Sequence, residues 1–332
     1  MPTVVLIFFA ALLFAVGATP LARRVAFTLG ILDQPNARKV HTSPVPLLGG
    51  VAIYIAFLAA LLLFSDAFYV NQVIGILLGA TWVSFLGIWD DWRTLRPLFK
   101  LAGQCLAIAL LVVTGVNVEF LRNPILNILV TAAWVVGITN AVNFLDNMDG
   151  LSGGVAAIAS AWFLVLSLVN GQFLVAPFAA ALLGASLGFL VYNFNPARIF
   201  MGDAGSLFLG FMLAAVGLKL RFPDHPDSIT WMIPVLVLGI PVLDMTLVTI
   251  SRLRRGVNPW TTAGKDHLSH RLVALGMTHR RAVLVIYGLC ILSGALGFII
   301  QYVSFEVAYA IFTLALIAGA LIIFFFEWKA RK

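Results

Sequence analysis

Charged residues are scarce in this chain of 332 residues. Asp, Glu, Lys and Arg make up only 11% of the sequence, whereas hydrophobic residues make up 61%. The mean hydropathy is +1.03. Soluble globular domains carry about 25% charged residues, so this composition excludes a soluble globular protein.

Cysteine is also rare, with one residue at position 105 and one at position 290. Both lie inside apolar stretches, and the sequence has neither a CxxC pair nor an HExxH motif. These absences argue against a disulfide framework and a structural zinc site. The two thiols are expected to be small packing residues within helices.

What the sequence does contain is a series of apolar runs near the length that crosses a bilayer as an α-helix. Strand-length segments of alternating hydrophobicity, which a membrane barrel needs, are missing. We therefore predict an all-α, polytopic membrane bundle that forms a single transmembrane domain over residues 1–332. No basic residue precedes the first run, so it is expected to remain as an uncleaved helix. The eleven expected helices cover residues 3–22, 49–65, 71–89, 98–116, 125–145, 151–169, 173–192, 205–220, 229–250, 282–300 and 305–326.

Basic residues alternate from one connection to the next. When the connections are numbered by the helix that each follows, the odd-numbered ones hold all Lys and Arg except Arg122, Lys219 and Arg221. The positive-inside rule then puts the odd connections and the C-terminus in the cytoplasm and the N-terminus outside. The net charge of +7 accordingly indicates topology and anionic lipid, and no nucleic-acid partner is expected.

Acidic, asparagine and histidine residues gather on the same odd-numbered connections. Polar groups from distant parts of the chain would therefore meet at the cytoplasmic membrane surface, which is typical of an active site there. The expected active-site loops are residues 23–48, 90–97, 146–150, 193–204 and 251–281.

The tandem acids Asp90 and Asp91 end an apolar run in the motif "DDW". Adjacent carboxylates repel each other, so a pair at a membrane interface needs a cation or a proton. Mg²⁺ prefers such hard oxygen ligands and often bridges carboxylates to phosphates, and Arg93, Arg96 and Lys100 follow as phosphate contacts. A solvated polar loop is the alternative.

The stretch "NAVNFLDNMDGL" is the richest polar cluster. On a continuing helix, Asn140, Asn143 and Asn147 would share one face. Asp146 and Asp149 lie beside them, which exceeds what helix capping requires. The cluster indicates a site for a metal, a phosphate or a nucleoside.

Two further clusters begin helices. Asp203 opens "DAGS", where a helix N-terminus can receive phosphate, although a lone Asp there is more often a simple N-cap. His267 and His270 stand three residues apart beside Lys265, Asp266 and Arg271. Phosphate contact fits this set better than zinc, and a charged interfacial helix is the alternative.

Two features remain open on the residues alone. Arg38, Lys39 and His41 precede a proline-rich turn and a Gly-Gly pair, and they suit either phosphate contact or simple topology charges. Asp244 lies within an apolar run, and we expect it to form a structural pair with a loop arginine.

Five motifs in order carry a resemblance to a known family. The chain resembles the polyprenyl-phosphate N-acetylhexosamine-1-phosphate transferases, the superfamily of MraY, WecA, TagO and the eukaryotic GlcNAc-1-phosphotransferase, nearly from end to end. Any one motif is weak evidence, but the ordered set is specific. The motifs are "RKVHTSPVPLLGG", "DDW", "NAVNFLDNMDGL", "NFNPARIFMGDAGS" and "DHLSHRL".

The resemblance implies a reaction at the cytoplasmic face of a bacterial plasma membrane. A UDP-N-acetylhexosamine gives its sugar-1-phosphate to undecaprenyl phosphate or another polyprenyl phosphate, which forms a polyprenyl-diphospho-sugar and releases UMP. Mg²⁺ is the implied cofactor, with Mn²⁺ as a substitute. Membrane lipid surrounds the protein, and a homodimer is one option for its assembly.

The resemblance also implies roles for individual residues. Catalysis falls on Asp90, Asp91, Asp146 and His267. The metal falls on Asp203 and Asn143, together with Asp90. The implied substrate contacts are Arg38, Lys39, His41, Lys100, Asn147, Met148, Asp149, Asn193, Phe200, His270 and Arg271.

The last motif departs from the family pattern, because Ser269 stands where WecA and TagO relatives often have a second histidine. In MraY the motif is a run of three histidines. The individual histidine roles therefore stay open. The motifs favour the WecA and TagO branch and a GlcNAc donor, with a phospho-MurNAc-pentapeptide transferase as the alternative. A transporter and a non-catalytic scaffold are weaker alternatives, since the acids lie at one face and no repeat is visible.

Overall fold

The computed structural model describes residues 2–34, 43–63, 70–172, 174–223, 225–259, 261–262 and 264–329. Over these residues the fold is helical, as predicted, apart from one short antiparallel pair of strands, β1 (Leu32–Asp33) and β2 (Val45–Pro46). The chain divides into two compact units, Met1–Lys219 and Leu220–Lys332. The single transmembrane domain stays a prediction.

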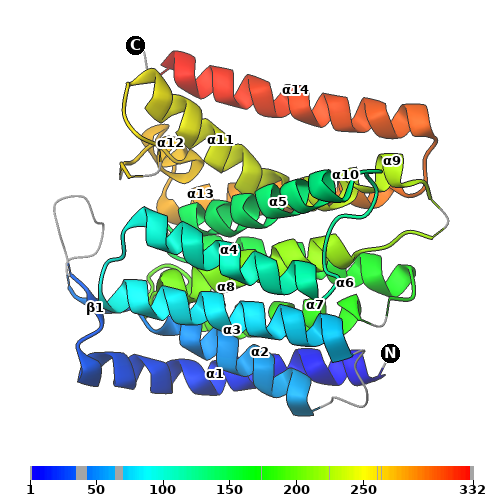
Figure 1. Cartoon of the computed structure of the whole chain (residues 1–332). Helices are drawn as coiled ribbons and strands as arrows, with labels where there is room; N and C mark the ends of the chain where they lie inside the picture. The colour runs from blue at the N-terminus through cyan, green and yellow to red at the C-terminus, as the bar shows by residue number, and fades with distance from the viewer. Residues whose placement is uncertain are drawn as a thin grey trace. The chain divides into compact units, whose positions relative to one another are not determined.

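The first unit contains eight helices, drawn from blue to green in Figure 1. They are α1 (Pro2–Leu29), α2 (Gly49–Leu63), α3 (Val70–Trp92), α4 (Pro97–Val113), α5 (Pro124–Leu145), α6 (Leu151–Val169), α7 (Val175–Asn193) and α8 (Gly202–Lys219). The second unit contains α9 (Asp227–Thr230), α10 (Met232–Val237), α11 (Gly239–Arg254), α12 (Leu268–Ala274), α13 (His279–Ile300) and α14 (Phe305–Lys329).

Among the described residues, eight helices are long and apolar enough to cross a membrane, or nine if one bent pair counts as a single span. Helices α2 and α4 are apolar but shorter. The all-α, multi-pass membrane fold is therefore confirmed. The total of eleven spans and the orientation of the termini stay predictions.

Helix α8 is the core of the first unit. It packs against α2, α3, α5, α6 and α7, and most of its side chains are buried. Apolar surface gains little by leaving lipid, so helices in a membrane associate through close packing of small residues. The sequence of α8 fits this requirement, because glycine and alanine alternate with the larger Phe208, Phe211 and Met212.

The run expected as one helix over residues 229–250 is broken, which corrects that prediction. Segment Asp227–Val237 meets segment Gly239–Arg254 at an angle of 72°. Pro241 lies in the first turn of α11, where its missing N–H costs nothing. Inside a continuous helix the same ring would clash with the carbonyl of the preceding turn, so the chain breaks at Leu238.

The start of α2 lies directly against the start of α8. Gly49 N and Gly50 N donate to the carbonyl oxygens of Phe200 and Met201 at 3.0 and 2.8 Å. A Cβ atom on Gly50 would lie 2.0 Å from the backbone nitrogen of Gly205. The glycine pair of the "PLLGG" motif thus lets two backbones touch.

We expect Gly50→Ala to destabilise the protein by about 1–3 kcal/mol, because overpacking against backbone forces the helices apart. Gly137→Ala is the matched control, since a Cβ at Gly137 meets nothing within 4 Å and alanine favours helix. Thermal unfolding in detergent measures both variants. Equal melting temperatures for the two would contradict the contact.

Candidate active site

Two carboxylates from different helices share one ammonium group at the ends of α3, α4 and α8. Lys100 Nζ lies 3.1 Å from Asp90 Oδ2 and also forms an ion pair with Asp203 Oδ2. Asp90 Oδ1 accepts a hydrogen bond of 2.6 Å from Leu95 N, so the loop after α3 helps to aim this carboxylate. The side chains of Asp90, Lys100 and Asp203 are mostly buried, and an ion pair is stronger where water is excluded.

Asn143 completes the group from α5. Its Nδ2 donates to Asp203 Oδ1 at 2.9 Å and to Ser206 Oγ at 2.8 Å. The Asp203 carboxylate therefore contacts Lys100 through one oxygen and Asn143 through the other. Residues 90, 100, 143 and 203, which are far apart in sequence, are brought together as the sequence motifs predicted.

Asp91 points elsewhere, toward the backbone at the start of α8. Its Oδ1 accepts from Asp203 N at 2.8 Å, and its Oδ2 accepts from Ala204 N at 3.1 Å. The first amides of α8 are thus bound to Asp91. The favoured interpretation of Asp203 as a simple N-cap is therefore wrong, because Asp91 caps the helix and the Asp203 side chain contacts Lys100 and Asn143.

The donor set fits a hard divalent cation. Asp90 and Asp203 both direct an oxygen at one cationic group, and Mg²⁺ prefers oxygen ligands and retains several waters. Among the described residues, no group of three or more His, Cys, Asp or Glu side chains is arranged to hold a metal. A metal here would therefore take few protein carboxylates and leave positions for water or phosphate.

A second polar group joins the loop after α5 to the loop after α7. Asp149 Oδ2 accepts from Asn195 Nδ2 at 3.0 Å and from Ala197 N at 2.9 Å. Asn193 Oδ1 accepts from Gly150 N at 3.0 Å, while its Nδ2 donates to the Ile199 carbonyl at 2.9 Å. Asp149 and Asn193, both expected to contact the nucleoside, thus hold these two loops to each other.

Asp146 interacts electrostatically with one acid of each group, Asp203 and Asp149. It is the C-cap of α5, and burial raises its pKa to about 8, with further contributions from the negative charges of Asp203, Asp149 and Asp33. Burial disfavours the charged form of a carboxyl group. A carboxyl group that holds its proton near neutral pH suits proton transfer or a site that a cation will neutralise.

The expected three-asparagine face is only partly correct. Helix α5 ends at Leu145, so Asn147 lies beyond it and its Nδ2 donates back to the Phe144 carbonyl at 2.6 Å. Asn140 Nδ2 donates to Gln104 Oε1 on α4 at 2.7 Å. Asn143 is therefore the member of that face that reaches Asp203.

The remaining expected nucleoside contacts are held through their backbones. Phe200 N donates to the Pro46 carbonyl at 2.8 Å, and Met148 O accepts from Leu151 N at 3.0 Å. Arg38, Lys39 and His41 lie outside the described residues.

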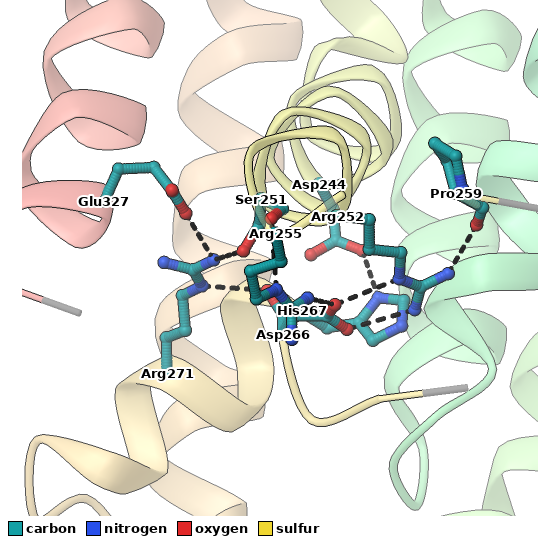
Figure 2. A network of polar contacts seen from close by, with 9 residues as sticks. All are labelled: Asp244, Ser251, Arg252, Arg255, Pro259, Asp266, His267, Arg271 and Glu327. Atoms are coloured by element: carbon teal, nitrogen blue, oxygen red, sulfur yellow. Dashed lines mark hydrogen bonds and ion pairs between the residues drawn. The ribbon is translucent and has the colours of Figure 1, made fainter. Parts of the chain in front are cut away.

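In the second unit, Asp244 and His267 form a buried pair (Figure 2). His267 Nδ1 lies 2.8 Å from Asp244 Oδ2, and Leu268 N donates to Asp244 Oδ1 at 2.6 Å. The expected pairing of Asp244 with a loop arginine is therefore wrong. The intramembrane carboxylate instead holds the first residues of α12, and a carboxylate on one ring nitrogen orients a histidine and selects its tautomer.

Asp266 is the acid that takes the arginines. It accepts two hydrogen bonds of 3.0 Å from Arg252, and Arg255 pairs with it as well. Burial alone would raise the pKa of Asp266, but hydrogen bonds and charge from Arg252 and Arg255 outweigh burial and hold it at about 2. Arg252 also donates to the Pro259 carbonyl at 2.6 Å, so the loop before α12 is fixed to α11 (Figure 2).

Arg271 on α12 is held by three elements, as Figure 2 shows. Its Nη2 donates to Glu327 Oε1 at 2.7 Å and to Ser251 Oγ at 2.9 Å, and its Nε donates to the Asp266 carbonyl at 2.8 Å. Sequence reasoning missed Glu327. Its only sequence signal is an acid at the end of an apolar run.

His270 stacks edge-on to His267, with ring centroids 6.1 Å apart. Burial lowers its pKa, and the charges of His267 and Lys265 lower it further. A neutral imidazole is therefore favoured at this position, which permits either hydrogen-bond donation or acceptance.

Comparisons with known proteins identify the family. The profile of glycosyl transferase family 4 matches residues 73–221, which include the Asp90, Asn143 and Asp203 motifs. A probable undecaprenyl-phosphate N-acetylglucosaminyl 1-phosphate transferase of Bacillus subtilis is 36% identical over 293 residues, which is 86% of this chain and 81% of the relative. The chain belongs to glycosyl transferase family 4. It is thus an enzyme of the glycosyl-1-phosphate transferase class, and the family resemblance read from its motifs is confirmed.

Two other relatives support the same assignment. A decaprenyl-phosphate N-acetylglucosaminephosphotransferase of Mycobacterium leprae is 34% identical over 306 residues, covering 81% of this chain and 77% of the relative. An undecaprenyl-phosphate alpha-N-acetylglucosaminyl 1-phosphate transferase of Yersinia pestis is 27% identical over 324 residues, covering 92% and 87%. Both alignments are longer than the first unit, so the similarity extends over both units of this chain.

The low pKa of Asp266 predicts a specific acid dependence. Because the folded-state pKa, about 2, lies below the ordinary value of about 3.9, Asp266 contributes stability that is complete above about pH 4 and is lost as the pH falls through 2. Asp266→Asn should destabilise the protein at pH 7, since it leaves Arg252 buried without its carboxylate. The gap between the melting temperatures of wild type and variant should narrow below pH 4.

Glu306→Gln serves as the control, because Glu306 is exposed and exposed charges contribute little. A gap between wild type and Asp266→Asn that stays constant from pH 7 down to pH 2 would contradict the role of this carboxylate.

Proposed function

We propose that the enzyme transfers N-acetylglucosamine-1-phosphate from UDP-GlcNAc to undecaprenyl phosphate, forming undecaprenyl-diphospho-GlcNAc and UMP. The observation that carries the proposal is the convergence of Asp90, Lys100, Asn143 and Asp203 at the ends of four helices. Such a group suits phosphoryl transfer, which depends on positioning and on neutralising charge at the transferring oxygens.

The relatives support the choice of substrates. Their names specify an N-acetylglucosamine phosphate and either an undecaprenyl or a decaprenyl acceptor. We extend the GlcNAc donor to this chain and prefer the undecaprenyl acceptor, which the Bacillus and Yersinia relatives share. A phospho-MurNAc-pentapeptide donor remains the alternative.

In the proposed reaction, a phosphate oxygen of the lipid attacks the phosphorus that bears the sugar. A new P–O bond to the lipid phosphate forms, and the bond between the sugar-bearing phosphorus and the bridging oxygen of the donor breaks, so that UMP leaves with that oxygen. In this proposal, the Lys100 ammonium binds a phosphate oxygen by charge-assisted hydrogen bonds. Asp90, which contacts Lys100, is proposed to accept a proton from the lipid phosphate.

Mg²⁺ is the proposed cofactor, with Mn²⁺ as a substitute. Asp203 and Asp90, with the Asn143 amide, are the residues that would hold it, and their oxygens are the ligand type that it prefers. When bound, the ion would neutralise negative charge on the donor diphosphate. Asn143 keeps the Asp203 carboxylate aimed through its hydrogen bond of 2.9 Å.

Further residues are proposed to bind the soluble donor. Asp149 and Asn193 brace the two loops that would receive the nucleoside, together with Asn147, Met148 and Phe200. Asp146 is proposed to act beside them as a proton carrier. His267, His270 and Arg271 on and next to α12 are proposed to contact phosphate, and the charges of the odd connections favour a site at the cytoplasmic face of a bacterial plasma membrane.

The acid cluster generates a direct test. Asp90→Asn and Asp203→Asn should each give a folded, inserted protein without detectable UMP release, because each removes a carboxylate at the reacting phosphates. Asp227→Asn is the matched control, since Asp227 is exposed on α9. Wild-type rates in either active-site variant would remove the cluster from the proposal.

The donor assignment is tested separately with purified protein, undecaprenyl phosphate and Mg²⁺ in detergent. UMP release should occur with UDP-GlcNAc and not with UDP-GalNAc or UDP-MurNAc-pentapeptide, and EDTA should abolish it until Mg²⁺ is restored. Release from UDP-MurNAc-pentapeptide alone would establish the alternative donor. A folded preparation that releases no UMP from any donor would refute the proposed substrates.

A further inference from the structure

The two adjacent acids of the "DDW" motif contact different parts of the first unit. Successive residues on a helix point about 100° apart, so neighbours need not serve one site. Asp90 contacts Lys100 and the loop after α3. Asp91 contacts the two backbone amides that open α8. The repulsion expected between the pair is thus relieved by separate partners.

Helix α8 needs a cap from outside itself. The first N–H groups of a helix have no partner within it, and an Asp at the start of a helix usually caps it with its own side chain. Here both oxygens of Asp203 are engaged elsewhere, one with Lys100 and one with Asn143. Asp91 supplies the acceptors instead, and its negative charge suits the positive end of the helix dipole.

The backbones of α3 and α8 pack closely around this cap. Gly87 lies one turn before Asp91 on α3, and a Cβ there would come within 2.4 Å of the Asp203 carbonyl. Gly202 has φ +66°, and a Cβ there would lie 2.4 Å from Asp91 Oδ2. Both positions require glycine, so the short Asp91 side chain is matched to a close approach of α3 and α8.

We infer that Asp91 is a positioning residue, which caps α8 so that the Asp203 side chain stays free to face Lys100 and Asn143. The inference rests on the proposed function for the role of Asp203 at the active site. The hydrogen bonds from Asp203 N and Ala204 N to Asp91 do not depend on that function. The two tandem acids then have different roles: Asp90 lies at the reacting groups, and Asp91 acts through Asp203. Asp91 then serves neither as a base nor as a primary metal ligand.

Hydrogen–deuterium exchange tests the cap without substrate or metal. In Asp91→Asn, peptides covering residues 200–206 should exchange faster, by roughly ten-fold at the opening amides, as loss of half of a charged cap implies. Asp90→Asn is the matched control, because it removes the neighbouring charge and leaves the cap intact. Equal exchange in wild type and Asp91→Asn, or equal acceleration in both variants, would overturn the inference.

A pair of substitutions separates a positioning role from a chemical one. Asparagine preserves the length of Asp91 and keeps one of its two acceptor oxygens, so it retains half of the cap, whereas glutamate preserves the charge but is too long for the space beside Gly202. A positioning role predicts that Asp91→Asn keeps measurable turnover, with kcat lowered roughly ten- to hundred-fold and both KM values within about three-fold of wild type. It also predicts that Asp91→Glu is the less active variant.

The opposite order, with Asp91→Glu active and Asp91→Asn inactive, would overturn the inference in favour of a base or a metal ligand. If the Asp91 variants do not insert, Gly87→Ala separates α3 from α8 and leaves both carboxylates in place. It should accelerate exchange of the same amides and lower kcat, and unchanged exchange in that variant would equally overturn the inference. Because exchange is read without substrate, a wrong donor or acceptor would leave this result intact.

Discussion

The ion pair between Lys100 and Asp203 is the interaction on which the candidate active site depends. A carboxylate among apolar helices is stable only when a cation or N–H group compensates its charge. Lys100 provides that compensation for Asp203 and Asp90 at once. The ends of α3, α4 and α8 are therefore held together by the same charges that are proposed to handle phosphate.

The polar contacts around this ion pair are organised so that each carboxylate has its own donors. Asp91 takes the α8 amides, Asn143 orients Asp203, and Asp149 takes the amides of the opposite loop. Site residues are thereby held by rigid helix ends and short loops. Phosphoryl transfer benefits from such preorganised charge, because no reorganisation is then needed during the reaction.

The second unit follows the same rule with different residues. Asp244 and Glu327 hold His267 and Arg271, which lie next to and on α12. Asp266, just before α12, holds Arg252 of α11 (Figure 2). A helix of seven residues has little stability of its own, so these contacts account for its order. The residues of the motif "DHLSHRL" thus anchor α12, in addition to the substrate contacts proposed for them.

The sequence by itself determined the class of the protein and the position of most helices. Apolar length and the spacing of charges are local properties, because lipid requires each span to satisfy its own backbone. The ordered motifs also identified the family and singled out Asp90, Asn143 and Asp203. The break at Leu238 escaped the sequence analysis, because periodicity averages over a proline in the first turn of a helix.

Only the tertiary structure decided which polar groups meet. Asp90 and Asp91 are equivalent in sequence, yet one faces Lys100 and the other caps α8, because a helix turns by about 100° between them. The partners of Asp244 and the role of Glu327 were likewise hidden, since their contacts join helices that are distant in the chain. Long-range pairing of buried charge depends on how helices pack, and no local pattern in the sequence records it.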